Sequence, residues 1–291
     1  MNTPRLIVGL IGVAAALTAS AVEYRAQAMG AWTTNLSRTS FAPTAKDAAS
    51  FSADVAVVAA RQLAPNWTLI AGLEAGLERV PSFTALDRVS LGGTLTLRRK
   101  FGLGPFAPVV EGSLGINRLE HRERGRDGWR EEGQIRIAQR FTETWRGAIF
   151  TRWQSVAATG APYDTHERRL GAEFAWDFAE RWSLSAGGSL LRGQVTANAA
   201  GTVWANALDG GFGSAIYDYY ESVPWAVTNT FGPGWVAYRV DCRADLWWGE
   251  LSWMWTDNTR AILRAETARV VNHVDVRYVT EIWTFGLVHR F

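Results

Sequence analysis

The sequence predicts an all-β chain that forms a transmembrane antiparallel up-and-down β-barrel of about twelve strands. Apolar and polar residues alternate along most of residues 22–291, and such alternation places successive side chains on opposite faces of a strand. Short connections alternate with long ones, as they do in transmembrane barrels. Aromatic residues stand beside both kinds of connection, where a membrane surface would lie.

The first 21 residues have the pattern of a signal peptide. Arg5 gives a positive start, residues 6–17 are apolar or small, and Ala19-Ser20-Ala21 provides a small-x-small cleavage site, with cleavage expected after Ala21. The apolar run is shorter than the roughly 20 residues that cross a bilayer as a helix, although a short N-terminal helix remains the alternative. Residues 22–291 are then expected to form a single barrel domain.

Composition excludes some classes of function. The chain has 291 residues and a formal net charge of +2, which gives no support to a nucleic-acid partner. Cys242 is the only cysteine, so the chain has no internal disulfide framework.

Alternation defines the expected strands in order. Between residues 87 and 99, for example, Leu91 and Leu95 alternate with Ser90 and Thr94. Each expected segment is long enough for the roughly 9–11 tilted residues that cross a bilayer. In one long segment the alternation slips near Trp247-Trp248, and a β-bulge is expected there. The expected strands are 24–34, 48–61, 67–79, 87–99, 105–118, 129–141, 145–157, 166–178, 182–195, 236–255, 259–271 and 278–291.

Five of the connections are short, and aromatic residues flank both ends of the strands. The short connections are 62–66, 100–104, 142–144, 179–181 and 257–258. The aromatic residues beside them are Trp67, Phe106, Trp145, Trp182 and Trp255, and those on the long-loop side are Trp32, Trp129, Trp153 and Trp235. A soluble β-sandwich or barrel is the alternative, but it has no need of aromatic residues at both ends of its strands.

The last strand carries a recognisable pattern. Trp283, Phe285, Leu287 and the terminal Phe291 share one face, with His289 as a departure from the usual apolar residue. This strand resembles the C-terminal strand of Gram-negative outer-membrane β-barrel proteins, porin-like ones among them. The resemblance implies signal-directed export to the outer membrane, short periplasmic turns and long extracellular loops. It also implies contact with outer-membrane lipid and lipopolysaccharide, and with the barrel-assembly machinery that reads this strand during biogenesis.

The polar faces of the strands predict a charged lumen, which allows two functions. The first is a small porin-like channel for passive transport of small hydrophilic solutes, tuned by its charges. The second is a structural or surface-recognition barrel whose lumen is plugged by arginine–carboxylate pairs, as the alternating signs of residues 239–245 suggest. The expected lumen residues are Glu74, Arg88, Arg98, Glu111, Arg130, Glu132, Arg136, Arg152, Arg169, Glu173, Arg239, Asp241, Arg243, Asp245, Arg264 and Glu266.

Three further features leave functional alternatives open. The long loop 196–234 could constrict the mouth or pack as a cap, and the arginines of 121–126 could bind lipopolysaccharide or form a solvated loop tip. A rim enzyme that hydrolyses lipid or peptide is a third function, for which Asp164 and His166 are the weak catalytic candidates. No metal ion or cofactor is expected, because the acidic residues match no established calcium loop.

Overall fold

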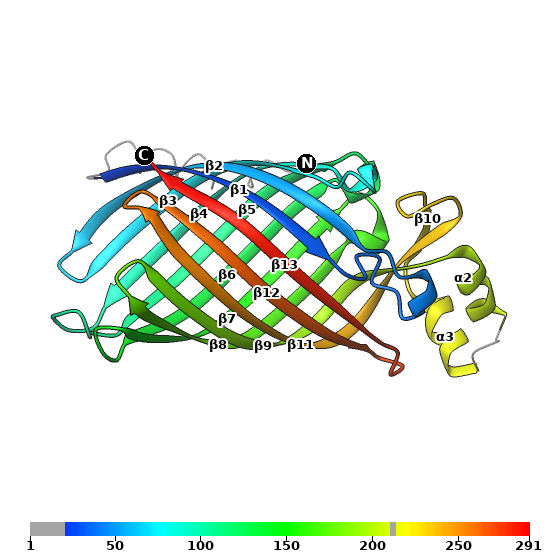
Figure 1. Ribbon diagram of the computed structural model, residues 1–291. Helices are drawn as coiled ribbons and strands as arrows, with labels where there is room; N and C mark the ends of the chain where they lie inside the picture. The colour runs from blue at the N-terminus through cyan, green and yellow to red at the C-terminus, as the bar shows by residue number, and fades with distance from the viewer. Residues whose placement is uncertain (1–20, 210–213) are drawn as a thin grey trace.

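The computed structural model describes residues 21–209 and 214–291, and these form a closed β-barrel (Figure 1). Residues 1–20, which carry nearly all of the expected signal peptide, lie outside the described residues. The barrel strands are β1 (Ala21–Thr33), β2 (Ala48–Ala64), β3 (Trp67–Arg79), β4 (Arg88–Lys100), β5 (Val109–His121), β6 (Gly128–Arg140), β7 (Trp145–Ala158), β8 (Thr165–Ala179), β9 (Trp182–Ala199), β11 (Trp235–Thr256), β12 (Thr259–Asn272) and β13 (Arg277–Arg290).

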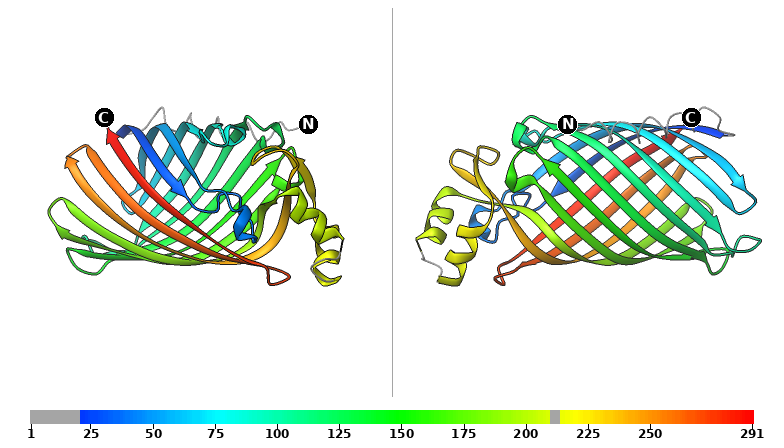
Figure 2. Two further views of the ribbon diagram at one scale, coloured as in Figure 1. Left: turned by 45° about the vertical axis from the view of Figure 1, so that its right-hand side comes forward. Right: turned by 180° about the vertical axis from the view of Figure 1, so that it is seen from behind.

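Every barrel strand pairs antiparallel with its neighbours in chain order, so the predicted twelve-strand up-and-down topology is confirmed. β13 pairs with β1 to close the ring, with Trp283 opposite Trp32. At the other end of these strands the Phe291 N–H donates a hydrogen bond of 2.9 Å to the Tyr24 carbonyl. The slanted strands form one continuous wall when the barrel is viewed from several directions (Figure 2).

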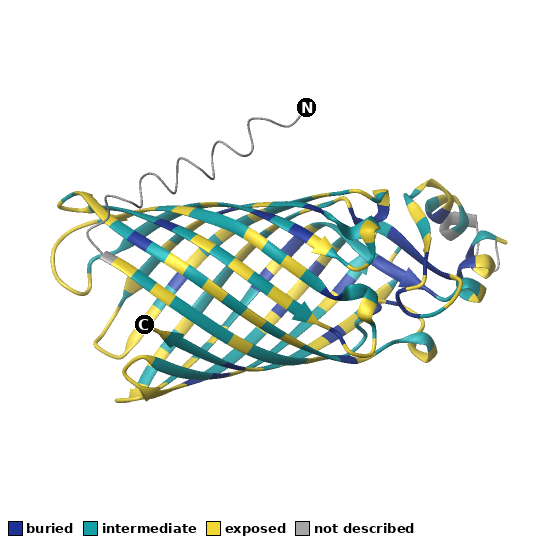
Figure 3. Cartoon of the chain, turned by 90° about the horizontal axis from the view of Figure 1, so that it is seen from above, coloured by how far each residue is buried: buried dark blue, intermediate teal, exposed yellow. Residues whose placement is uncertain are grey.

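Alternation of side chains gives the barrel an apolar outer face. Residues directly opposite in an antiparallel pair share a face of the sheet, so Leu95 and its partner Leu114 point the same way. Both are exposed, as are most large apolar side chains that lie on the same face of the other strands. Exposed and less exposed residues therefore alternate along the wall (Figure 3). Within the described residues, no helix combines the length and the apolar character that a membrane-crossing helix needs.

The two ends of the barrel differ. Connections 65–66, 101–108, 141–144, 180–181 and 257–258 lie at one end, here called the turn end, and six connections lie at the other, the loop end. Connection 101–108, expected as the short connection 100–104, is as long as L2 because β5 begins late. The loop-end connections are L1 (34–47), L2 (80–87), L3 (122–127), L4 (159–164), L5 (200–234) and L6 (273–276). Four of them contain a single 3-10 turn each, namely η1 (Ala42–Thr44), η2 (Thr84–Leu86), η3 (Arg124–Arg126) and η4 (Ala161–Tyr163).

L5 extends the barrel at the loop end. It contains α2 (Gly201–Leu208), α3 (Ser214–Ser222) and the short strand β10 (Trp225–Thr228), which pairs with the start of β11. These elements project beyond the barrel wall on the side away from the C-terminus (Figures 1 and 2). β9 and β11 continue into this region, which is why β9 ends at Ala199 rather than near residue 195.

Two details of the strand predictions are wrong. β5 begins at Val109 rather than at 105, because Pro105 and Pro108 cannot donate to a ladder and belong to the preceding turn. The expected bulge at Trp247-Trp248 is absent, since pairing of β11 with both neighbours runs without a break through these residues. The register shift in β11 lies near its end, between Met254 and Thr256.

Candidate functional site: the lumen and its cap

The inner face of the barrel brings together most of the charged residues that the sequence predicts. Arg136 of β6 reaches past β7 to Glu173 of β8, with 2.6 Å between Nη2 and Oε1. Such a pair forms only on the concave face, where alternate strands approach each other. The cross-strand registers place these predicted residues on the same face: Glu74, Arg88, Arg98, Glu111, Arg130, Glu132, Arg152, Arg169, Arg264 and Glu266.

Four of the predicted lumen residues, Arg239, Asp241, Arg243 and Asp245, lie on the outer face, so that part of the prediction is wrong. Asp245 lies opposite the exposed Leu190 of β9. A bulge at Trp247-Trp248 would have placed these charges on the face opposite to Trp247. The pairing has no bulge there, so they lie on the same outer face as Trp247. They are tolerated there because β11 is 22 residues long and its first half lies toward the loop end.

The adjacent Trp247 and Trp248 point to opposite faces of the wall. The Trp247 ring lies over Gly188 on the outer face, where an added Cβ would come within 2.7 Å of it. Trp248 lies over Gly187 on the inner face, and the Arg264 guanidinium is 5.3 Å from its ring centroid. Glycine is needed at both positions, because a side chain at Gly187 or Gly188 would collide with the indole that covers that side of the backbone.

Ion pairs line the lumen without filling it. Arg98 Nε is 2.7 Å from Glu111 Oε1, and Arg152 Nη2 is 2.6 Å from Glu132 Oε2. These side chains keep between 19% and 47% of their accessible surface although they point into the barrel. Water therefore reaches the paired charges.

A group of inner-face polar residues lacks partners within the described part of the chain. Asn117 of β5 is fully buried, and neither its Nδ2 nor its Oδ1 has a hydrogen-bond partner. Arg130, directly opposite on β6, has a buried Nε that is also unpartnered. Gly92 makes room for this pair, because a Cβ at that position would collide with Asn117 Oδ1. The sequence analysis missed Asn117, whose signal would have been an amide opposite a glycine on neighbouring strands.

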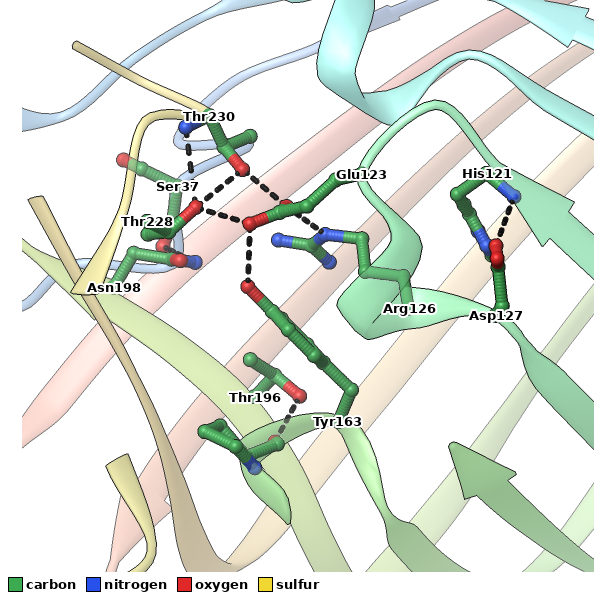
Figure 4. Close-up of polar contacts among 11 residues, drawn as sticks. Ser37, His121, Glu123, Arg126, Asp127, Tyr163, Thr196, Asn198, Thr228 and Thr230 are labelled. Carbon is green, nitrogen blue, oxygen red and sulfur yellow. Dashed lines mark hydrogen bonds and ion pairs between the residues drawn. The ribbon is translucent and has the colours of Figure 1, made fainter. Parts of the chain in front are cut away.

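Glu123 of L3 is the centre of a hydrogen-bond network at the loop end (Figure 4). Its carboxylate accepts hydrogen bonds of 2.5 Å from the hydroxyls of both Thr228 and Thr230 in L5. Tyr163 Oη of L4 donates to it at 3.1 Å, and Arg126 Nε at 2.8 Å. Burial alone would raise the pKa of Glu123, but the hydrogen bonds from Thr228, Thr230 and Arg126 outweigh burial and lower it.

Further contacts join L1 to the end of β9 and L2 to L5. Asn198 Nδ2 donates to the Ser37 carbonyl of L1 at 2.9 Å, and both residues are buried. Phe83 of L2 packs edge-on against Phe231 of L5, with ring centroids 5.0 Å apart. L2, L3, L4 and L5 therefore interlock, and L1 is fixed beside them to the end of β9. L2 follows β3 and L5 follows β9, on opposite sides of the ring of strands, so this assembly, here called the cap, crosses the opening.

The cap changes two sequence-based interpretations. The segment 121–126 is only partly a solvated loop tip: the side chains of Glu123 and Arg126 are 20% and 17% exposed within the cap, whereas Arg122 and Arg124 are exposed. Trp235, expected at a membrane surface, is buried beside Phe231 instead. Between the alternatives for L5, its packing against the other loops favours a cap.

L5 also carries an aromatic core. Trp204 of α2, Tyr220 of α3 and Tyr238 of β11 pack together, with Trp204 and Tyr238 ring centroids 4.9 Å apart. Tyr219 accepts a hydrogen bond from the Asp241 N–H at 3.2 Å, and burial raises its pKa to about 12. The helices are thus fixed to the extended β9–β11 pair rather than free in solution.

The candidate rim-enzyme residues do not form a catalytic pair in this geometry. Asp164 contacts Arg239 through both its carbonyl and its carboxylate, while His166 is exposed on the outer face opposite Ser155 of β7. Among residues 21–209 and 214–291, no group of three or more histidine, cysteine or acidic side chains could hold a metal ion.

Comparison with known proteins gives a match of fold. No family model and no curated protein matches the chain. A COG4313 outer membrane channel from Pseudomonas putida F1 aligns with a TM-score of 0.56 and 10% identity, over 93% of this chain and 95% of the channel. The NanC porin aligns at 0.46 and the KdgM porin at 0.42, each at 10% identity, over 92% and 93% of this chain and 99% and 98% of theirs. The chain therefore has the closed antiparallel β-barrel fold of bacterial outer-membrane porins and channels.

Proposed function

We propose that this protein is a porin-like channel of a bacterial outer membrane, with its turn end in the periplasm and its loop end outside. Small hydrophilic solutes pass through the lumen by diffusion when the cap is displaced. The observation that carries the proposal is the partial exposure of the paired charges inside the barrel. Burying so many ions in a dry plug would cost several kcal/mol each, whereas a water-filled lumen keeps them hydrated.

The lumen cations that make no ion pair attract anionic solutes where they stand, against the opposing charge of Glu74 and Glu167 on the same face. Arg169 makes no ion pair within the described residues and donates only to the Ser189 hydroxyl, at 3.1 and 3.3 Å. Arg130 of the same inner face has an unpartnered Nε. A cation without a fixed carboxylate partner raises the local concentration of anions, as charge rings do in selective pores.

Planar-bilayer recording of the refolded protein tests this function. We expect discrete conductance steps and, under a salt gradient, a reversal potential that indicates selectivity for anions. Replacing both Arg130 and Arg169 with Gln should move the reversal potential toward cation selectivity. Arg269→Gln is the matched control, because this exposed arginine lies on the outer face, opposite Asp245, and should leave selectivity unchanged. If no variant conducts ions, including one with a disrupted cap, the channel function is rejected.

A surface-recognition barrel with a blocked outer mouth is the second candidate. The interlocked cap favours it, because buried polar residues such as Ser37, Asn198 and Thr228 hold the loops in one arrangement. The same recordings separate the two functions: a blocked barrel stays silent even after the cap contacts are removed.

A further inference from the structure

Three arginines form a row on the outer face of the wall. Arg168 of β8 lies directly opposite Arg192 of β9, which lies directly opposite Arg243 of β11. All three are exposed, and none makes an ion pair with a carboxylate of the described residues. Like charges directly opposite each other destabilise a sheet, so the row points to an anion from outside the chain.

The height of the row matches a membrane surface. On β9, Arg192 comes ten residues after Trp182, which lies next to a short turn and stacks on Trp253 at 5.5 Å. At about 3.3 Å per residue and a tilt of about 40°, ten residues rise roughly 25 Å, which is the height of the apolar band of a transmembrane barrel. Trp153 continues the row on β7, opposite Arg168, as expected for an aromatic residue at headgroup level.

An apolar groove begins directly below the arginine row. Leu170 and Leu190 lie at its upper edge, two residues from Arg168 and Arg192 along their strands. Its floor is made by small residues, among them Ala172, Ala186 and Gly188, and the Trp247 ring stands over that floor. The groove has a volume of about 1090 Å³ and a largely apolar lining.

The two features fit one ligand. We propose that the outer face of β8, β9 and β11 binds a lipid A molecule of lipopolysaccharide, with a headgroup phosphate on Arg168, Arg192 and Arg243 and an acyl chain in the groove. A phosphate monoester presents more charge and more acceptor oxygens than the diester of a glycerophospholipid. It therefore matches a row of three guanidinium groups better, even with Asp241 and Asp245 on the same face.

This site is separate from the lumen, although it rests on the proposed outer-membrane location. The three arginine side chains point away from Arg130, Arg169 and the other residues assigned to conduction. Loss of lipid binding should therefore leave conductance unchanged, and loss of conductance should leave lipid binding unchanged. The two proposals can fail independently.

Native mass spectrometry of the detergent-solubilised barrel, titrated with bisphosphorylated lipid A, tests the site. We expect one tightly held lipid A, roughly tenfold or more weaker binding for Arg192→Gln, and a further loss when Arg168 and Arg243 are also changed to Gln. Arg118→Gln is the matched control, because this outer-face arginine lies near the Trp129 ring but has Glu120 at 3.6 Å. Heat-modifiable mobility on gels verifies that each variant is folded.

Two comparisons define the ligand. Dephosphorylated lipid A and phosphatidylglycerol should bind more weakly than lipid A, and equal binding of either would overturn the assignment to a phosphate monoester. Ala186→Trp fills the groove with an apolar side chain and should weaken lipid A binding, and unchanged binding would overturn the acyl-chain placement. Unchanged binding by the triple arginine variant would overturn the site as a whole.

Discussion

Removing the Glu123 carboxylate should open the cap. In Glu123→Ala the hydroxyls of Thr228, Thr230 and Tyr163 lose their common acceptor, so the link between L3 and L5 is lost. L3 and L4 stay joined by the hydrogen bond from the Gly160 N–H to the Gly125 carbonyl. A hydrogen bond to a charged group contributes about 1.5–3 kcal/mol, but bonds that share one carboxylate do not add. Breaking a buried charged network costs about 3–5 kcal/mol, and because Glu123 keeps a fifth of its surface we expect about 3 kcal/mol.

A change of about 3 kcal/mol corresponds to roughly 100-fold in the ratio of closed to open cap. Single-channel recording in planar bilayers measures this ratio as open probability. Limited proteolysis of the reconstituted barrel reports the release of L5 independently. Glu120→Gln is the matched control, because this carboxylate lies three residues away but is exposed and outside the network.

Equal open probability and equal cleavage of L5 in Glu123→Ala and the parent protein would refute the role assigned to this carboxylate. An increase in the cleavage of L5 without any conductance would support the role of Glu123 in holding the cap and would reject the channel function.

Three other perturbations test the remaining features. Leu95→Arg should impair assembly, since a charge at the lipid face near the midplane costs about 2–4 kcal/mol. Thr94→Arg places the charge in the lumen and should be tolerated. Equal yields of folded barrel from the two variants would contradict the assignment of these β4 side chains to opposite faces. Arg136→Gln leaves Glu111 and Glu173 without their shared cation, so reversal potentials should shift toward cation selectivity; an unchanged value would place this network off the conduction path. The cap should loosen in acid: the lowered pKa of Glu123 stabilises the cap above the ordinary carboxyl value of about 4.3, and this stabilisation disappears as the pH falls through the lowered pKa. Open probability that is flat from neutral pH to below that range would argue against titration of Glu123.

The strands could be predicted from the sequence because each depends on a local pattern. A period of two, repeated over a membrane-crossing length, fixes both the strand and its lipid face. The prediction failed at β11, where Trp247 and Trp248 are adjacent and only one can face lipid. Whether Trp247 or Trp248 faces lipid depends on the pairing of β11 with β9, whose residues lie about 60 positions earlier in the chain.

The cap could not be predicted for the same physical reason. Glu123, Thr228 and Ser37 belong to three loops with no shared periodicity, and their contacts depend on where the barrel places the loop ends. Residues 121–126 have the composition of a hydrated turn, and contacts with the neighbouring loops bury only Glu123 and Arg126 among its charged side chains. The lumen residues were largely predictable, because their facing follows from the strands alone.

The paired indoles on the two sides of one backbone have a practical consequence. Trp247 stands on the lipid side of Gly188, whereas Trp248 stands on the lumen side of Gly187, so consecutive residues report on two different media. Brominated acyl chains should quench the fluorescence contributed by Trp247, and dissolved iodide admitted to the barrel should quench that of Trp248. Difference spectra between the two single Trp→Phe variants would thus follow hydration of the interior and the state of the surrounding bilayer in the same sample.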